Sequence, residues 1–173
     1  MILEFRHPWI GLGLTPTPIG NGIEGLSFVT KSDPTERIME EFLDEWHRIV
    51  ANRDLSALEK ILAEDVSMGA PPYWDPLNGR KLVHHLLGLI INTIEDFTYH
   101  REWHSEATGK REIALEFKGH LGEHDLQGID LISLNEQGEI QNLDVMIRPM
   151  NVLSALRDVI APKMMEFLKN NAG

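Results

Sequence analysis

Two carboxylates in the last third of the chain, Asp130 and Asp144, are the residues whose type and spacing point most directly to chemistry. Gly138, between them, predicts a three-residue hairpin loop in which Asn135 pairs with Glu139. Counting back along the two strands then pairs Asp130 with Asp144 on one face of a sheet. Facing carboxylates under a cover raise at least one pKa, so this pattern predicts a general acid/base site.

The same loop predicts two further cross-strand pairs, Leu134 with Ile140 and Ile132 with Asn142. A two-residue turn is the alternative, and it would shift the register by one residue and send the two acids to opposite faces. The sequence leaves both registers open.

Large side chains that could form the walls of a ligand site around these acids occur along the whole chain. The candidates for ligand contacts are Trp46, Tyr73, Trp74, Trp103 and Met146. Trp74 lies between prolines and is expected to contact a ligand or cover a cavity mouth. The alternative is that these residues are ordinary core, because large side chains at helical or strand spacing usually pack there.

The eight histidines do not have the spacing of a metal site, so we expect no metal and no cofactor. His84 or its neighbour His85, on a predicted helix, could face the cavity as an acid/base partner of Asp144. The alternative is a histidine pair on the polar edge of that helix.

Composition narrows the classes of function. The chain has 173 residues, a mass of 19.7 kDa, a net charge of -11 and no cysteine. The charge disfavours nucleic acid and anionic membrane surfaces as partners, and the lack of cysteine excludes disulfides and thiolate nucleophiles. No apolar stretch is long enough to span a membrane, and the N-terminal residues do not resemble a secretory signal. We therefore expect a cytoplasmic protein.

Hydrophobic periodicity predicts an irregular N-terminal arm over residues 1–32 and one α+β domain over residues 33–173. The arm is rich in glycine, proline and apolar residues, which would prefer to be covered. The domain is expected to contain helices over about 33–52, 54–62, 80–94 and 152–169, a short strand at 65–68, and four antiparallel strands in meander order between 97 and 148.

The last two predicted strands are apolar on both faces, as the alternation of Ile129 and Leu131 with Ile132 and Leu134 shows. A sheet with one wet face should instead alternate between apolar and polar residues. Helices would cover one face. We expect a second subunit or the arm to cover the other, and a homodimer packed through the sheet is the favoured form.

The order of elements and several short motifs resemble the nuclear transport factor two-like fold, in its SnoaL-like branch. The motifs are Asn52-Arg53-Asp54-Leu55, Leu62-Ala63-Glu64-Asp65-Val66, Gly128-Ile129-Asp130-Leu131, Gly138-Glu139-Ile140 and Val145-Met146-Ile147-Arg148-Pro149. This resemblance covers about residues 34–168 and implies a curved sheet around helices, a cystatin-like α+β barrel, with a cone-shaped cavity for a small apolar molecule.

Asp144 resembles the final-strand aspartate of the limonene-epoxide-hydrolase branch. Ala114 and Glu116 stand where that branch carries an arginine and a second aspartate. The resemblance implies metal-free acid/base chemistry of cyclase, isomerase, dehydratase or epoxide hydrolase type, or else a non-catalytic binding or protein-interaction module. In both cases a small, largely apolar organic molecule is the expected ligand.

Overall fold

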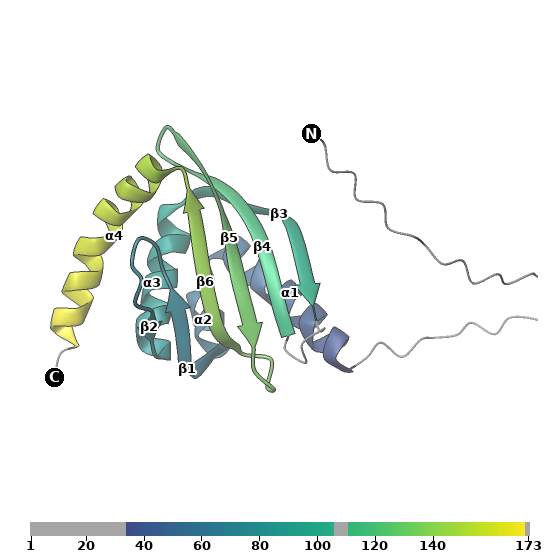
Figure 1. The fold of residues 1–173 in the computed structure, drawn as a ribbon. Coiled ribbons are helices and arrows are strands. Elements are labelled where there is room, and N and C mark those ends of the chain that lie inside the picture. Colours follow the sequence, from purple (N-terminus) through teal and green to yellow (C-terminus); the bar gives the residue numbers. More distant parts are fainter. Residues whose placement is uncertain (1–33, 106–110, 172–173) are drawn as a thin grey trace, which may run out of the picture. The chain divides into compact units, whose positions relative to one another are not determined.

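The computed structural model describes residues 34–105 and 111–171. These residues form an α+β domain with four helices and a six-stranded sheet (Figure 1). The elements are α1 (Pro34–Asn52), α2 (Leu55–Lys60), β1 (Leu62–Gly69), β2 (Leu77–Asn78), α3 (Arg80–Thr93), β3 (Glu95–Ser105), β4 (Arg111–Leu121), β5 (His124–Leu134), β6 (Ile140–Arg148) and α4 (Met150–Asn170). The predicted arm lies outside the described residues. So do Thr108 and Gly109, where the sequence indicates the turn between the first two strands of the meander.

The sheet has the strand order β2-β1-β6-β5-β4-β3, so the four-strand meander is confirmed. Beyond this meander, β1 and β6 pair in parallel, so the sheet as a whole is mixed. A helix and four strands lie between β1 and β6 in the chain, so no tight turn forces these two strands to run in opposite directions. The turn between β4 and β5 contains Gly122, which has a φ of 60°.

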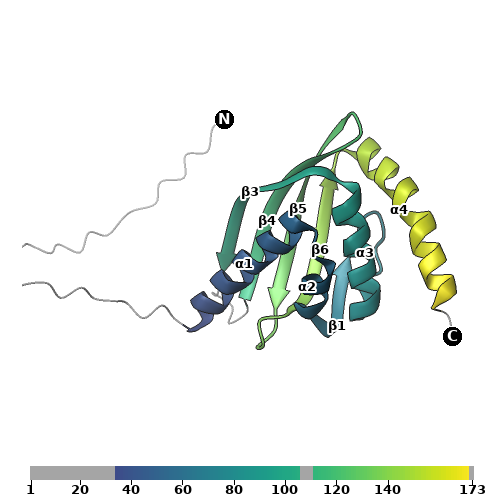
Figure 2. The same cartoon turned by 180° about the vertical axis from the view of Figure 1, so that it is seen from behind.

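Helices α1, α2 and α3 cover one face of the sheet (Figure 2). The apolar stripe of α1 explains its place there, since Phe42, Trp46 and Ile49 recur at helical spacing and are all buried. The hydrophobic core lies between these helices and the inner face of the sheet. Among the described residues, no helix has the length and apolar character needed to cross a membrane.

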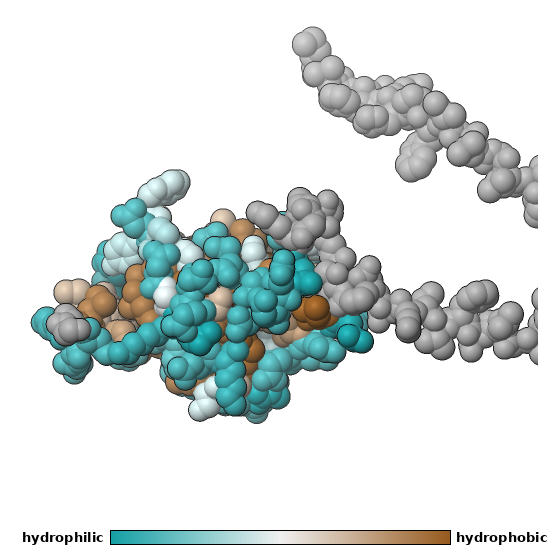
Figure 3. Space-filling view, turned by 90° about the horizontal axis from the view of Figure 1, so that it is seen from below, coloured by the Kyte–Doolittle hydropathy of each residue, from teal (hydrophilic) through white to brown (hydrophobic). Residues whose placement is uncertain are grey.

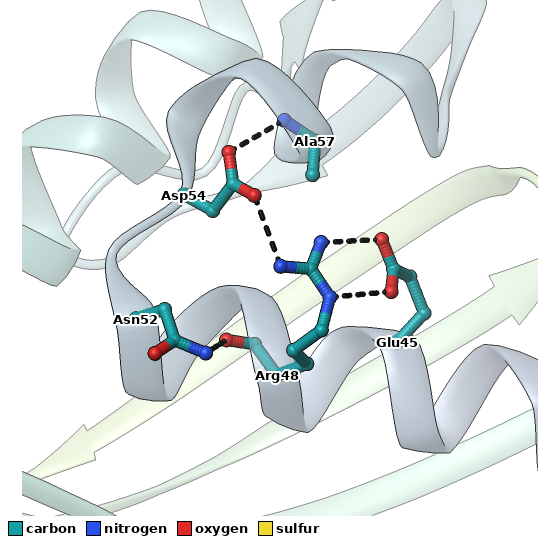
Figure 4. A network of polar contacts seen from close by, with 5 residues as sticks. All are labelled: Glu45, Arg48, Asn52, Asp54 and Ala57. Atoms are coloured by element: carbon teal, nitrogen blue, oxygen red, sulfur yellow. Dashed lines mark hydrogen bonds and ion pairs between the residues drawn. The ribbon is translucent and has the colours of Figure 1, made fainter.

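A polar network joins the end of α1 to the start of α2 (Figure 4). Asp54 is the predicted N-cap of α2, and its Oδ1 accepts a hydrogen bond from the backbone nitrogen of Ala57 at 3.0 Å. Its other oxygen accepts from Arg48 at 3.0 Å, and Arg48 also pairs with Glu45 at 2.7 Å. The cap fixes where the second helix begins and therefore where α3 can pack against it.

The opposite face of the sheet, the outer face, exposes apolar side chains on three strands. Trp103, Leu131 and Met146 are 48%, 37% and 56% exposed there. The strand register places Ala114 between Trp103 and Leu131 on the same face. The expectation of two apolar faces is confirmed for β5, where Leu131 is exposed opposite the buried Ile132. It is wrong for β6, whose apolar residues lie mostly on the inner face while Asn142, Asp144 and Arg148 share the outer face with Met146. What covers the outer face in solution stays a prediction.

Candidate functional site

The β5–β6 hairpin begins as predicted. Gly138 has a φ of 81°, and the backbone nitrogen of Asn135 donates to the carbonyl oxygen of Glu139 at 2.9 Å. Leu134 pairs with Ile140, as expected for a three-residue loop. The loop type is thus confirmed, and the alternative two-residue turn is wrong.

A β-bulge follows directly after this pair and shifts the pairing of the residues that lie further along the two strands. Ser133 pairs with Asn142, so Gln141 has no partner of its own on β5. One unmatched residue shifts the register by one position, and Ile132 faces Leu143 where Asn142 was expected.

The bulge separates the two candidate acids. Asp130 pairs with Val145 and Asp144 pairs with Leu131, so the prediction that the two carboxylates share one face is wrong. Asp144 is exposed on the outer face, with its carboxylate against the backbone of Gly69. The two acids cannot act on one ligand together.

Asp130 points into the domain and is the one charged or polar residue among the buried residues described, with 6% exposure. The Tyr99 hydroxyl donates a hydrogen bond to its Oδ2 at 2.6 Å. The indole nitrogen of Trp46 donates in turn to the Tyr99 oxygen at 2.9 Å. A helix and two strands, α1, β3 and β5, therefore contribute one side chain each to a buried polar chain.

Burial raises the pKa of Asp130 to about 7, and the hydrogen bond from Tyr99 acts in the opposite direction. Burial also raises the pKa of Tyr99 well above its usual value, with the charge of Asp130 as a second cause. The raised carboxyl pKa predicted from two facing acids is thus present, but its cause is burial. A carboxyl group with this pKa can carry or release a proton near neutral pH.

Aromatic packing holds Tyr99 in place. The Tyr99 and Phe97 rings lie 5.1 Å apart in an edge-to-face arrangement, and Phe97 stacks on Phe117 at 4.7 Å. Gly128, two residues before Asp130, makes room for Phe117, since a Cβ on Gly128 would lie 2.3 Å from the phenyl ring. These contacts position the donor against Asp130.

Asp130 and Tyr99 line a small cavity of about 20 Å³, which is room for about one water molecule. All other lining residues of this cavity are apolar or aromatic, and Trp46 is one of them. A charged form of Asp130 would therefore meet no positive charge there.

A second cavity of about 520 Å³ lies between α3, α4, β6 and the segment from Ala70 to Leu77. Its lining is mostly apolar and its volume is in the range of small-molecule sites. Ile90, Val145 and Ile147 line both cavities, so the larger one ends against the chamber that holds Asp130. Figure 3 shows hydrophobic surface at the end of the domain that carries the C-terminus, where α4 ends.

The structure brings some of the predicted ligand contacts to these cavities and removes others. Trp46 lines the small cavity, and Tyr73 and Trp74 line the large one, where they are 63% and 96% exposed. Trp103 and Met146 line neither cavity and lie on the outer face.

Local irregularities explain these two corrections. A register shift between Tyr99 and Arg101 turns Trp103 away from the face that holds Tyr99. The bulge near Gln141 likewise turns Met146 away from the face that holds Asp130.

His84 is not an acid/base partner of Asp144. Its Nε2 lies 2.8 Å from the carbonyl oxygen of Leu55, so this histidine joins α3 to α2. Within the described ranges, no three His, Asp or Glu side chains gather as a metal site would require.

Tyr99 is the site residue that the sequence analysis missed. Its signal was a phenol two residues after Phe97, on the same face of a predicted strand, because a buried hydroxyl group needs a hydrogen-bond partner. The long separation from Asp130 in the chain concealed which partner that would be.

Comparison with solved structures defines the class of this protein. A steroid delta-isomerase from Pseudomonas aeruginosa is 36% identical over 80% of this chain and 99% of its own, with a TM-score of 0.71. An uncharacterised protein with a cystatin-like fold from Silicibacter pomeroyi is 37% identical over 81% of this chain and 94% of its own, with a TM-score of 0.64. The chain belongs to the nuclear transport factor two-like family of cystatin-like α+β proteins.

More distant structures share the fold alone. One is an epoxide hydrolase/cyclase-like enzyme of pyran ring formation in the polyether salinomycin, with 17% identity over 67% of this chain and 94% of its own and a TM-score of 0.56. No protein-family model matches the sequence. No curated protein matches it either.

Proposed function

We propose that this protein binds a small, largely apolar carbonyl compound in the 520 Å³ cavity and that Asp130, as a neutral acid, donates a hydrogen bond to the carbonyl oxygen. The observation that carries the proposal is the buried Asp130 carboxyl group, bonded to Tyr99, with a pKa of about 7. The apolar lining of the large cavity supports an apolar ligand.

The hydrogen bonds around Asp130 leave one oxygen available. Oδ2 accepts from Tyr99, and no described residue contributes a hydrogen bond to Oδ1. When Asp130 is protonated, its proton therefore resides on Oδ1 and can be donated to a ligand. Such a donor polarises a carbonyl group and acidifies the neighbouring C–H bond, which is the first requirement of isomerase-type proton transfer. The 36% sequence identity to a steroid delta-isomerase supports this class of chemistry.

A non-catalytic binding protein is the second candidate, and one observation favours it. Asp144, the expected second acid, lies on the outer face, and Asp75 is the other carboxylate among the described lining residues of the two cavities. Asp75 is exposed at the mouth of the large cavity. A buried donor without a nearby base would hold a carbonyl ligand and leave it unchanged.

Deuterium exchange into cyclohexanone in D₂O distinguishes the two candidates. We expect the wild-type protein to accelerate exchange at the carbon next to the carbonyl, with solvent D₂O or OD⁻ taking the proton and D₂O returning a deuteron to the carbon. Asp130→Asn should reduce this acceleration by about 10²-fold or more. Asp144→Asn is the matched control, because it makes the same change on the outer face, and it should leave the rate unchanged. Binding of cyclohexanone without exchange would favour the non-catalytic protein, and equal rates for wild type and Asp130→Asn would refute the role of Asp130.

A further inference from the structure

Three apolar side chains line both the large cavity and the chamber that holds Asp130. We propose that Ile90, Val145 and Ile147 form a partition that selects ligands by how far their carbonyl oxygen projects from the apolar body. This inference rests on the proposed function and names the substrate class for the same site: a compound with an unhindered carbonyl at its edge.

The strand register places the partition next to the acid. Val145 pairs directly with Asp130, so their Cβ atoms lie about 5 Å apart on the same face. Ile147 pairs with Gly128, and the Phe117 ring lies directly in front of that glycine. Ile90 comes from α3, on the other side of the cavity. The three side chains thus approach one opening from both the sheet and the helix layer.

The burial of these residues agrees with a position between two spaces. Ile90, Val145 and Ile147 are each only half-buried, whereas Leu87 and Ile91, their neighbours around the small cavity, are buried. An isoleucine or valine in a filled core would be covered on all sides. Each of these three residues instead presents part of its surface to open space.

The volume of the small cavity limits which chemical groups can enter it. A space of about 20 Å³ accepts one oxygen-sized group and no ring or branched carbon. The body of the ligand must therefore stay in the larger cavity while the carbonyl oxygen reaches past the partition to Asp130. A ketone with bulky groups on both sides of the carbonyl would be stopped before its oxygen arrived.

Two ketones test the partition, with the infrared carbonyl stretch as the readout. Cyclohexanone has an open carbonyl, and the carbonyl of 2-adamantanone lies between two bridgehead carbons. In the wild-type protein we expect a lowered stretching frequency for bound cyclohexanone, which Asp130→Asn abolishes, and no such shift for 2-adamantanone. Ile90→Ala should give 2-adamantanone the shift and tighten its binding about tenfold.

Leu86→Ala is the matched control, because Leu86 lies on the same helix and lines only the large cavity. It should leave the carbonyl stretch of bound 2-adamantanone unshifted. Val145→Ala removes partition volume from the strand side and replaces Ile90→Ala if that variant does not fold.

The outcomes separate the two proposals. Wild-type cyclohexanone without an Asp130-dependent shift would overturn the proposed function. The partition alone would be overturned by a different result. In that result bound cyclohexanone shows the shift, and the carbonyl stretch and affinity of 2-adamantanone are the same in wild type, Ile90→Ala and Val145→Ala.

Discussion

At the scale of single residues, the environment of Asp130 decides what this site can do. Its carboxyl group is enclosed by apolar and aromatic side chains, and Tyr99 gives it one hydrogen bond. Desolvation outweighs that hydrogen bond and raises the pKa of Asp130 to about 7, so the neutral form is favoured below that pH. The same residue type on the outer face, Asp144, has no such enclosure.

The raised pKa predicts a pH dependence of stability. The folded state holds the proton of Asp130 up to a pH of about 7, whereas the unfolded value is 3.8. The group's stabilising contribution is complete below pH 3.8 and is lost as the pH rises to about 7. The shift corresponds to about 4 kcal/mol as an upper estimate.

Urea unfolding of wild type and Asp130→Asn between pH 4.5 and 8 measures this effect. We expect the wild type to lose stability relative to the variant as the pH rises, with the loss slowing above the pKa of about 7. Tyr99 is the other titratable group that faces Asp130, and His47 contacts the Tyr99 ring at 5.4 Å. Since both remain in the variant, their own titrations largely cancel in the difference. A constant difference across the range would contradict a raised pKa.

At the scale of elements, the helices and the meander were predictable because their signals are local. Apolar periodicity located α1 and α3, Asp54 marked the start of α2, and Gly138 marked the β5–β6 loop. The bulge at Gln141 was not predictable, since no residue type marks it. The pairing of β6 with β1 changes register at the same place on β6, and that long-range pairing has no local signal either. The bulge residue decided which acid enters the site.

Asp54 gives a prediction at this scale, because it is both the cap of α2 and a partner of Arg48. Asp54→Ala should lower the free energy of unfolding by about 1 kcal/mol, as loss of an N-cap does. Arg48→Ala removes the exposed ion pair and keeps the cap, so it should cost less than about 0.5 kcal/mol. Thermal unfolding followed by circular dichroism measures both, and equal losses would show that the ion pair, and not the cap, stabilises the junction.

At the scale of the whole molecule, the outer face of the sheet is the surface on which we expect a partner. Trp103, Leu131 and Met146 form an exposed apolar patch on it. We propose that a second copy of the chain packs on this face, which would leave both cavities, on the inner side, free to bind ligand. A stable interface of this kind would bury about 800 Å² on each subunit.

Light scattering with size-exclusion chromatography tests this assembly. We expect the wild type to elute as a dimer and the double variant Leu131→Glu, Met146→Glu as a monomer, because the charges would have to be buried. Val159→Glu, at a 40% exposed position on α4, is the control and should remain a dimer. A monomeric wild type would contradict the proposal.

The central claim is that Asp130 is a buried acid that titrates near neutral pH and meets the ligand. Carbon NMR of protein labelled at the aspartate carboxyl carbons, with Asp130→Asn to assign the signal, measures this most directly. We predict a titration midpoint of about 7 that moves upward when cyclohexanone binds, since a bound carbonyl accepts a hydrogen bond only from the neutral acid. A midpoint near 4, unchanged by the ketone, would contradict the account.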